Sequence, residues 1–154
     1  RALAQLCISK QSAATPRIGH RSSASIMSMQ IAISTARAKR AAAEKGYVVD
    51  PFASQLCEAE PAGDPLLHRG YYARHRAVDL ALRAFLREFP AGQIVALGCG
   101  LDSSFWRLSA TGAAPAAYFE VDSELVVAEK QRLIRLSPAL LAAAGAAAGA
   151  AGSM

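Results

Sequence analysis

The chain has 154 residues, of which 53% are hydrophobic, and a formal net charge of +5 at pH 7. This length suffices for one domain with its own core, although many of the hydrophobic residues are alanines, which bury little area each. No run of 18 or more strongly apolar residues is present, so we expect no membrane span. The three cysteines fit neither a disulfide framework nor a zinc site, which favours a reduced, cytoplasmic location.

The basic charge is concentrated at the N-terminal end of the sequence. Residues 1–46 hold eight Lys and Arg against the single acid Glu44, whereas residues 47–154 hold nine against eleven acids. A nucleic-acid-binding domain would carry a basic face, with aromatic residues among the charges, on the folded part of the chain. That pattern is missing from the sequence, so nucleic acid is not expected as a partner.

The first part of the chain has an unusual composition. Residues 1–26 are rich in Ser, Ala and Arg, lack acids and show no periodicity, which is typical of an organellar transit peptide. A second interpretation, which we favour, is an over-extended translation ahead of a true start at Met27 or Met29. Under either interpretation we expect residues 1–30 to be poorly ordered, and only the first would place the protein in an organelle.

Two helices are predicted in the region that follows. Residues 34–45 are good helix formers, and Gly46 suits the position just after a helix. After a connection rich in Pro, Gly and Asp, a long helix is expected over residues 69–89, with one apolar stripe at helical spacing. The stripe consists of Val78, Ala81, Leu82, Phe85, Leu86 and Phe89, and the other side carries Arg76, Asp79, Arg83 and Arg87.

The most informative stretch is QIVALGCGLDSSFWRL, at residues 93–108. Its apolar run 94–97 predicts a buried parallel strand. A glycine-rich turn follows and leads into a helix that Asp102 or Ser103 can cap.

A second strand is predicted at residues 118–121 and a second helix at 123–136. Strand, turn, helix, strand and helix in this order open a doubly wound, Rossmann-like α/β fold. From residue 138 the sequence is a low-complexity Ala/Gly tail, so we expect the sheet to be truncated after about two strands. The expected organisation is a segment 1–30, N-terminal helices with the first half of the α/β domain over 31–137, and the tail 138–154.

Gly98 and Gly100 lie where the first predicted strand ends and a helix begins. A nucleotide-like ligand at such a turn approaches the backbone closely, which a Cβ would block. Asp122 lies 24 residues beyond Gly98, at the end of the second predicted strand, where an acid can accept hydrogen bonds from both ribose hydroxyls of an adenosine cofactor. The alternative interpretation is a tight turn with an incidental acid.

Dinucleotides and S-adenosylmethionine fit the same turn but differ in charge. A dinucleotide site prefers a third glycine, because the diphosphate rests on the helix N-terminus. Here Ser103 takes that position and Asp102 puts a negative charge beside it. That charge would repel a diphosphate but not a sulfonium-bearing amino acid, so the sequence favours S-adenosylmethionine over NAD.

Four segments carry a narrower resemblance. In this order and spacing, KGYVVDPF, HRGYYARHRAV, QIVALGCGLDSSFWRL and YFEVD resemble the leucine carboxyl methyltransferase family over residues 37–136. The glycine-rich motif is common to many methyltransferases, whereas the Arg-Gly-Tyr-Tyr helix start and the FWRL run are much narrower. The resemblance implies the N-terminal part of an S-adenosylmethionine-dependent methyltransferase.

The resemblance also implies a set of cofactor-binding residues. The family's contacts come from a lysine ahead of the GY element, the arginine of RGY-x-x-R, the first glycine of the turn and the acid that closes the second strand. These fall on Lys39, Arg74, Gly98 and Asp122, with Gly100 in the same turn. Lys39 and Arg74 would bind carboxylate groups through charge-assisted hydrogen bonds.

The family resemblance implies methylation of the C-terminal leucine carboxylate of a type-2A protein phosphatase catalytic subunit. A carboxylate with a pKa of about 3.5 is ionised at neutral pH, so direct displacement at the methyl group needs neither a general base nor a metal ion. We therefore assign no catalytic residue and no metal ligand. His20, His68 and His75 are interpreted as surface or helix-start residues.

Three other functions remain open from the sequence. The segment GYVVDPFASQL resembles the sister tRNA enzyme of wybutosine synthesis at least as well as the phosphatase branch. The chain could instead be an inactive truncated product or an interaction fragment. An NAD-linked oxidoreductase is the last alternative.

Overall fold

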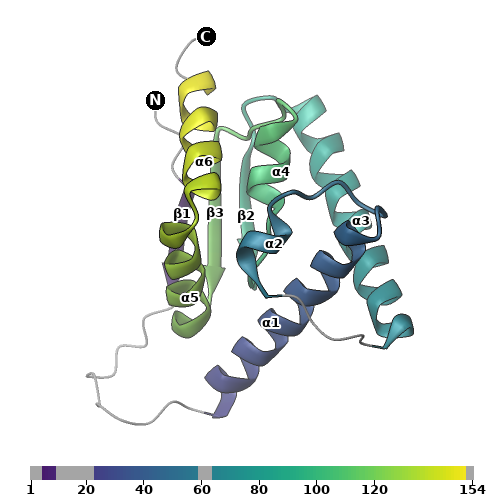
Figure 1. Cartoon of the computed structure of the whole chain (residues 1–154). Helices are drawn as coiled ribbons and strands as arrows, with labels where there is room; N and C mark the ends of the chain where they lie inside the picture. The colour runs from purple at the N-terminus through teal and green to yellow at the C-terminus, as the bar shows by residue number, and fades with distance from the viewer. Residues whose placement is uncertain (1–4, 10–22, 59–63, 152–154) are drawn as a thin grey trace, which may run out of the picture.

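A computed structural model describes residues 5–9, 23–58 and 64–151 (Figure 1). These residues form three strands and six helices, and none of the helices in these ranges is long and apolar enough to cross a membrane. The elements in chain order are β1 (Gln5–Ser9), α1 (Ser23–Glu44), α2 (Ala53–Leu56), α3 (Pro65–Glu88), β2 (Gln93–Leu97), α4 (Ser104–Ala110), β3 (Ala117–Asp122), α5 (Glu124–Leu136) and α6 (Pro138–Ala151).

The strands form one parallel sheet in the order β1-β3-β2. Strand β2, helix α4, strand β3 and helix α5 follow each other as predicted, which confirms the α/β class and the opening of a doubly wound fold. Counted with β2 as its first strand, a doubly wound fold places its third strand beside the second, which is β3 here. Here β1 takes this place and pairs with β3 from Tyr118 to Asp122.

The sequence did not predict β1. The expected lack of order over residues 1–30 is wrong for Gln5–Ser9 and for the start of α1 at Ser23, and the rest of that prediction lies outside the described residues. A bare edge of β3 would leave backbone N–H and C=O groups unpaired, and β1 supplies partners for them. A strand of five residues without alternating polarity gives little local signal.

The helices cover one face of the sheet, and Figure 1 shows α5 and α6 in front of β1 and β3, with α4 beside β2 and α3 further out on the same side. Ile94 and Tyr118 point to the covered face and are buried, whereas Val95 and Leu97 are 60% and 78% exposed. The predicted burial of β2 is therefore found on one of its two faces only. Alternate side chains of a strand point to opposite faces, and only one face has a layer of described helices over it.

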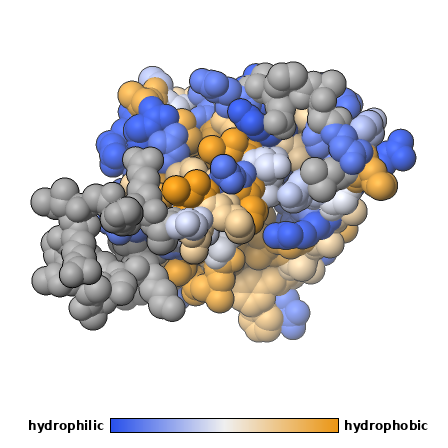
Figure 2. Space-filling model, turned by 90° about the horizontal axis from the view of Figure 1, so that it is seen from below, coloured by the Kyte–Doolittle hydropathy of each residue, from blue (hydrophilic) through white to orange (hydrophobic). Residues whose placement is uncertain are grey.

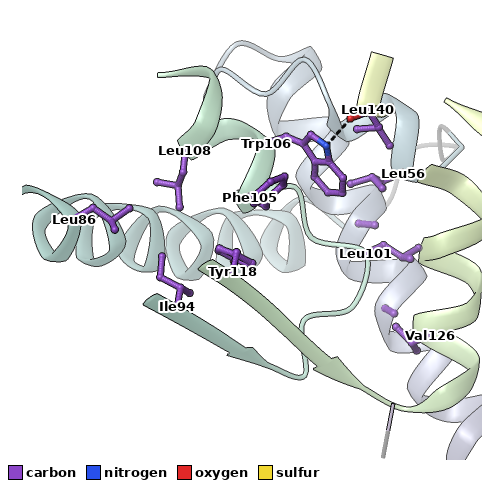
Figure 3. Packing of buried hydrophobic residues seen from close by; sticks show 12 residues of the cluster. Leu56, Leu86, Ile94, Leu101, Phe105, Trp106, Leu108, Tyr118, Val126 and Leu140 are labelled. Atoms are coloured by element: carbon purple, nitrogen blue, oxygen red, sulfur yellow. Dashed lines mark hydrogen bonds between the residues drawn. The ribbon is translucent and has the colours of Figure 1, made fainter. Parts of the chain in front are cut away.

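The core lies between α4, the covered face of the sheet and α6 (Figure 3). Trp106 is fully buried, and its Nε1–H donates a hydrogen bond of 3.0 Å to the carbonyl oxygen of Leu140. Leu140 is itself fully buried, so the start of the predicted tail belongs to the folded domain. The tail forms a helix because alanine is the best helix former and Pro138 suits the first helical position.

Helix α3 is rotated relative to its predicted apolar stripe. Leu86 is buried as predicted, but Val78, Phe85 and Phe89 are exposed. Asp79, expected on the other side, is only 3% exposed. The rotation brings the Asp79 carboxylate to Arg107 of α4, which is also buried and needs a charged partner.

We predict that the core on α4 dominates the stability of the fold. Replacing the fully buried Leu108 by Ala should lower the free energy of unfolding by about 2–5 kcal/mol, because the change removes packed methyl groups and leaves a cavity. Replacing Leu80 of α3, which is 51% exposed, by Ala should cost less than about 1 kcal/mol. Urea denaturation of the two variants measures both values, and equal losses would contradict this description of the core.

Candidate functional site

The backbone between β2 and α4 turns through two left-handed residues. Gly98 has φ +64° and Gly100 has φ +56°, a conformation that residues with a Cβ rarely adopt. A Cβ added to Gly98 would meet no atom within 4 Å, so the space over this residue is open. The turn therefore presents bare main chain to a neighbouring group, as the two glycines predicted.

Asp122 ties this turn to the end of β3. Its Oδ2 accepts a hydrogen bond of 2.7 Å from the Gly100 N–H, and its Oδ1 accepts one of 2.7 Å from the Ser123 N–H. An ionised carboxylate has about four lone-pair sites, so each oxygen can accept a further hydrogen bond. The acid is thus held in place and still able to bind hydroxyl groups.

Two adjoining cavities open around the turn, and they enclose about 230 and 260 Å³. Taken together they fall within the range of about 300–1,000 Å³ that is typical of ligand sites. The first cavity is lined by all five residues that the sequence predicted to bind a cofactor, namely Lys39, Arg74, Gly98, Gly100 and Asp122. The wall shared by the two cavities consists of Thr35, Lys39, Arg74, Gly98 and Cys99.

Figure 2 looks onto the end of the molecule at which β2 and β3 end, where hydrophobic and hydrophilic residues interleave. This end of a parallel sheet is the usual place for a ligand in doubly wound folds. Within the described ranges, no group of three or more His, Cys, Asp or Glu side chains is arranged to hold a metal ion.

The two predicted cations differ in their surroundings. Lys39, near the C-terminal end of α1, donates a hydrogen bond to Oδ1 of Asp102, and the side chains of both residues are largely buried. Arg74 on α3 is exposed at the cavity wall and has no ion pair or hydrogen bond with another described residue. The structure thus brings both cations together as predicted, but Asp102, predicted only at the helix start, is an additional part of the site.

Asp102 is surrounded by positive charge. Burial alone would raise the pKa of its carboxyl group, but the charges of Lys39 and Lys130 outweigh burial and hold that pKa far below its usual range. The Lys130 ammonium group donates to the Asp102 carbonyl oxygen at 2.7 Å and to Oε1 of Glu120 at 2.6 Å. Lys130 and Glu120 are both fully buried, and the hydrogen bond from Lys130 to Asp102 fixes the turn against them.

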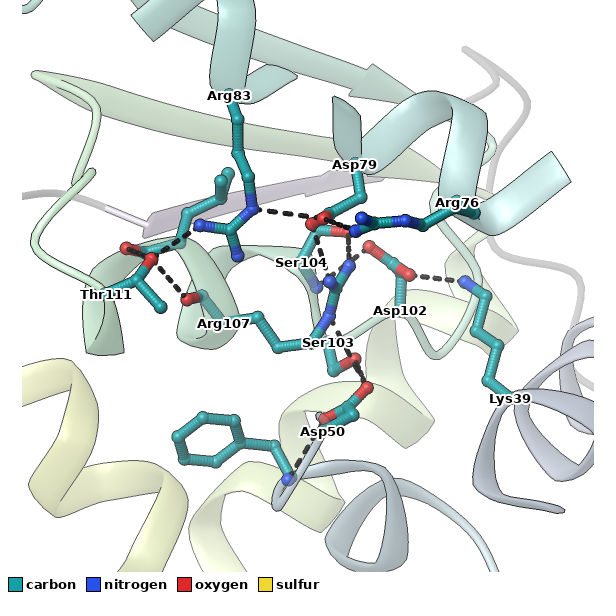
Figure 4. Close-up of polar contacts among 12 residues, drawn as sticks. Lys39, Asp50, Arg76, Asp79, Arg83, Asp102, Ser103, Ser104, Arg107 and Thr111 are labelled. Carbon is teal, nitrogen blue, oxygen red and sulfur yellow. Dashed lines mark hydrogen bonds and ion pairs between the residues drawn. The ribbon is translucent and has the colours of Figure 1, made fainter. Parts of the chain in front are cut away.

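A second buried network holds the start of α4 (Figure 4). Arg107 donates to Oδ1 of Asp79 at 2.6 Å and lies 3.5 Å from Oδ2 of Asp50. The Ser103 hydroxyl also donates to Asp50. Burial would raise the pKa of Asp79, but hydrogen bonds and charge from Arg83 and Arg107 lower it. Sequence analysis missed this network, because a charged residue at helical spacing gives no sign that it is buried.

The prediction that His75 lies at the surface is wrong. His75 is only 6% exposed, lines the second cavity, and has a buried Nε2 without a hydrogen-bond partner. Burial, together with the nearby charges of Arg107 and Lys39, lowers its pKa to about 4. The imidazole is therefore neutral near pH 7, which keeps an additional positive charge out of the site.

A further cavity of about 280 Å³ lies between the end of α1 and the start of α3. Tyr47 and Tyr72 line it, and their ring centroids are 5.9 Å apart. None of the predicted cofactor-binding residues lines this cavity. We therefore place the candidate site at the glycine turn, where the predicted residues converge.

The low pKa of His75 predicts a specific pH dependence of stability. As the pH falls from 6.5 to 4.5, His75 takes up protons in the unfolded chain but stays largely neutral in the folded chain, so the folded state loses about 2 kcal/mol of stability. The variant His75→Gln lacks this group and should lose correspondingly less over the same range. Urea denaturation at several pH values measures the difference, and equal losses in both proteins would contradict the assigned pKa.

Comparison with known proteins shows that the chain is similar to methyltransferases of one family and to related proteins. A family model described as leucine carboxyl methyltransferase matches residues 28–150, which include all five predicted cofactor-binding residues. The tRNA wybutosine-synthesizing protein 4 of Homo sapiens is 44% identical over 119 residues, which are 73% of this chain and 17% of the relative. Leucine carboxyl methyltransferase 1 of Rattus norvegicus is 38% identical over 104 residues, which are 66% of this chain and 31% of the relative. The chain thus spans less than a third of the length of these relatives.

Proposed function

Since the chain belongs to the leucine carboxyl methyltransferase family, we propose that the two cavities at the glycine turn bind S-adenosylmethionine for methyl transfer to a carboxylate. Asp122 accepts hydrogen bonds from the ribose hydroxyls, and Gly98 and Gly100 allow the ligand to lie against bare main chain. Lys39 and Arg74, on the wall shared by the two cavities, bind the carboxylate of the cofactor's amino-acid part.

One observation carries this proposal. The hydrogen bond from the Gly100 N–H to Asp122 joins the open turn after β2 to the acid at the end of β3. A small ligand can therefore touch both at once, and the two cations lie on the wall of the same cavity. The open space over Gly98 is the space that a Cβ would take from the ligand. A diphosphate fits less well, because Asp102 already accepts a 3.0 Å hydrogen bond from the Ser104 N–H at the start of α4.

The chemistry asks little of the protein beyond binding and orientation. The bound cofactor would supply an electrophilic methyl group on a positive sulfur, and an ionised carboxylate is nucleophilic without a general base. The residues of this chain hold the sugar and the amino-acid part, so the methyl group keeps one direction. The neutral His75 adds no competing charge.

The methyl acceptor is a separate part of the proposal. By family we propose the C-terminal leucine carboxylate of a type-2A phosphatase catalytic subunit, with a tRNA of the wybutosine pathway as second candidate. The second candidate is favoured by the 44% identity to the human relative, against 38% to the rat leucine carboxyl methyltransferase 1. Incubation with cofactor carrying a tritiated methyl group should label the phosphatase subunit, and should not label a subunit that lacks its terminal leucine. Label found only in tRNA would contradict the first acceptor.

Cofactor binding is tested most directly through the acid. The change Asp122→Ala should weaken the binding of S-adenosylhomocysteine by about 10- to 100-fold, because hydrogen bonds to a charged group contribute about 1.5–3 kcal/mol. Isothermal titration calorimetry of the purified chain measures this loss. Glu124→Ala, two residues further on and exposed, is the matched control and should bind as the unchanged chain does. Equal affinity in Asp122→Ala would remove the main support for the proposal.

A further inference from the structure

Lys39 is a cation held largely out of water at the wall of the proposed cofactor site. Its side chain is 15% exposed and that of Asp102 is 14% exposed, and the two form an ion pair (Figure 4). A buried ammonium group without a partner is costly, so a lysine in this place needs a companion anion. Asp102 is the only carboxylate among the described residues with which Lys39 forms an ion pair.

We propose that Asp102 is a positioning residue, which holds the Lys39 ammonium group on the shared cavity wall so that it meets the carboxylate of the bound cofactor. This inference rests on the proposed function. Asp102 itself lines only the second of the two cavities. It acts through Lys39 and not through a contact with the methyl group.

Asp102 suits this role because it is fixed from several sides. Its Oδ2 accepts a hydrogen bond of 3.0 Å from the Ser104 N–H, and its carbonyl oxygen accepts one of 2.7 Å from Lys130. Lys130 is in turn paired with the buried Glu120. Lysine, by contrast, has a flexible four-carbon stem that loses much rotamer freedom when it binds a ligand. An ion pair to a fixed carboxylate removes that freedom before the ligand arrives.

The charges on the second cavity give a second argument. The charged residues that line it are Lys39, Arg74 and Asp102, which sum to one net positive charge. One carboxylate of a ligand balances that charge. Without Asp102 the same wall would carry two positive charges, which suits a phosphate better than a single carboxylate. Asp102 therefore fixes the position of Lys39 and also sets the net charge of the residues that line the second cavity.

A purely structural role for Asp102 is the competing explanation, because its carboxylate also caps α4. The change Asp102→Asn separates the two, since an asparagine oxygen still accepts the Ser104 N–H while the negative charge is lost. Two ligands read out the difference. S-adenosylhomocysteine carries the amino-acid carboxylate, and 5′-methylthioadenosine shares the adenosine but lacks the whole amino-acid part.

In the experiment, both ligands are titrated into the full chain by calorimetry. Asp102→Asn should weaken S-adenosylhomocysteine binding by about 5- to 10-fold and leave 5′-methylthioadenosine binding within about 2-fold. Lys39→Met should show the same selectivity, and adding Asp102→Asn to Lys39→Met should cause no further loss, because both changes remove one interaction. Asp79→Asn is the matched control, since Asp79 is a buried, ion-paired carboxylate that lines neither cavity.

Several results would overturn the inference. Unchanged or tighter S-adenosylhomocysteine binding by Asp102→Asn would do so, as would an equal loss for both ligands or a further loss in the double variant. Circular dichroism checks that each variant is folded, and Asp102→Ser, which also keeps a capping oxygen, replaces Asp102→Asn if that variant unfolds. If the unchanged chain bound neither ligand, the proposed function would fail together with this inference. If the unchanged chain bound both ligands and Asp102→Asn bound S-adenosylhomocysteine equally tightly, only the positioning role would be contradicted.

Discussion

The candidate site depends on one hydrogen bond, from the N–H of Gly100 to the carboxylate of Asp122. It joins the turn after β2 to the end of β3, so the left-handed backbone of Gly98 and Gly100 keeps a fixed place against the acid. Because Asp122 also accepts from the Ser123 N–H, its side chain cannot turn away without losing both bonds. This one connection therefore fixes the positions of the bare backbone, the acid and the cavity relative to one another.

Buried ion pairs set the position of the helices around that turn. Asp102 links α1 to the turn through Lys39, and Lys130 links the turn to α5 and β3. Arg107 and Asp79 link α4 to α3. Pairs of this kind contribute little net stability, but breaking one is costly, so they favour a single arrangement of the helices. A site formed by residues of α1, α3 and two strand ends needs such a fixed arrangement.

The sequence predicted the elements and the converging residues better than it predicted their surroundings. The order of strands and helices and the turn at Gly98 follow from apolar periodicity and glycine placement, which are local signals. The burial of His75 and the exposure of Leu97 depend on which elements pack against them, and periodicity carries no such information. Strand β1 was missed for the same reason, since it is stabilised by the free edge of β3 and not by its own residues.

The central claim is that the adenosine part of S-adenosylmethionine, which its demethylated form S-adenosylhomocysteine shares, lies against the backbone at Gly98. Titration of the ¹⁵N-labelled chain with S-adenosylhomocysteine, followed by amide NMR spectra, tests it most directly. The account predicts that the amide signals of Gly98 and Gly100 shift, whereas those of Gly46 and Gly112, which also have positive φ but line neither cavity, stay in place. Shifts confined to the cavity between Tyr47 and Tyr72, or no shifts at a saturating concentration, would contradict it.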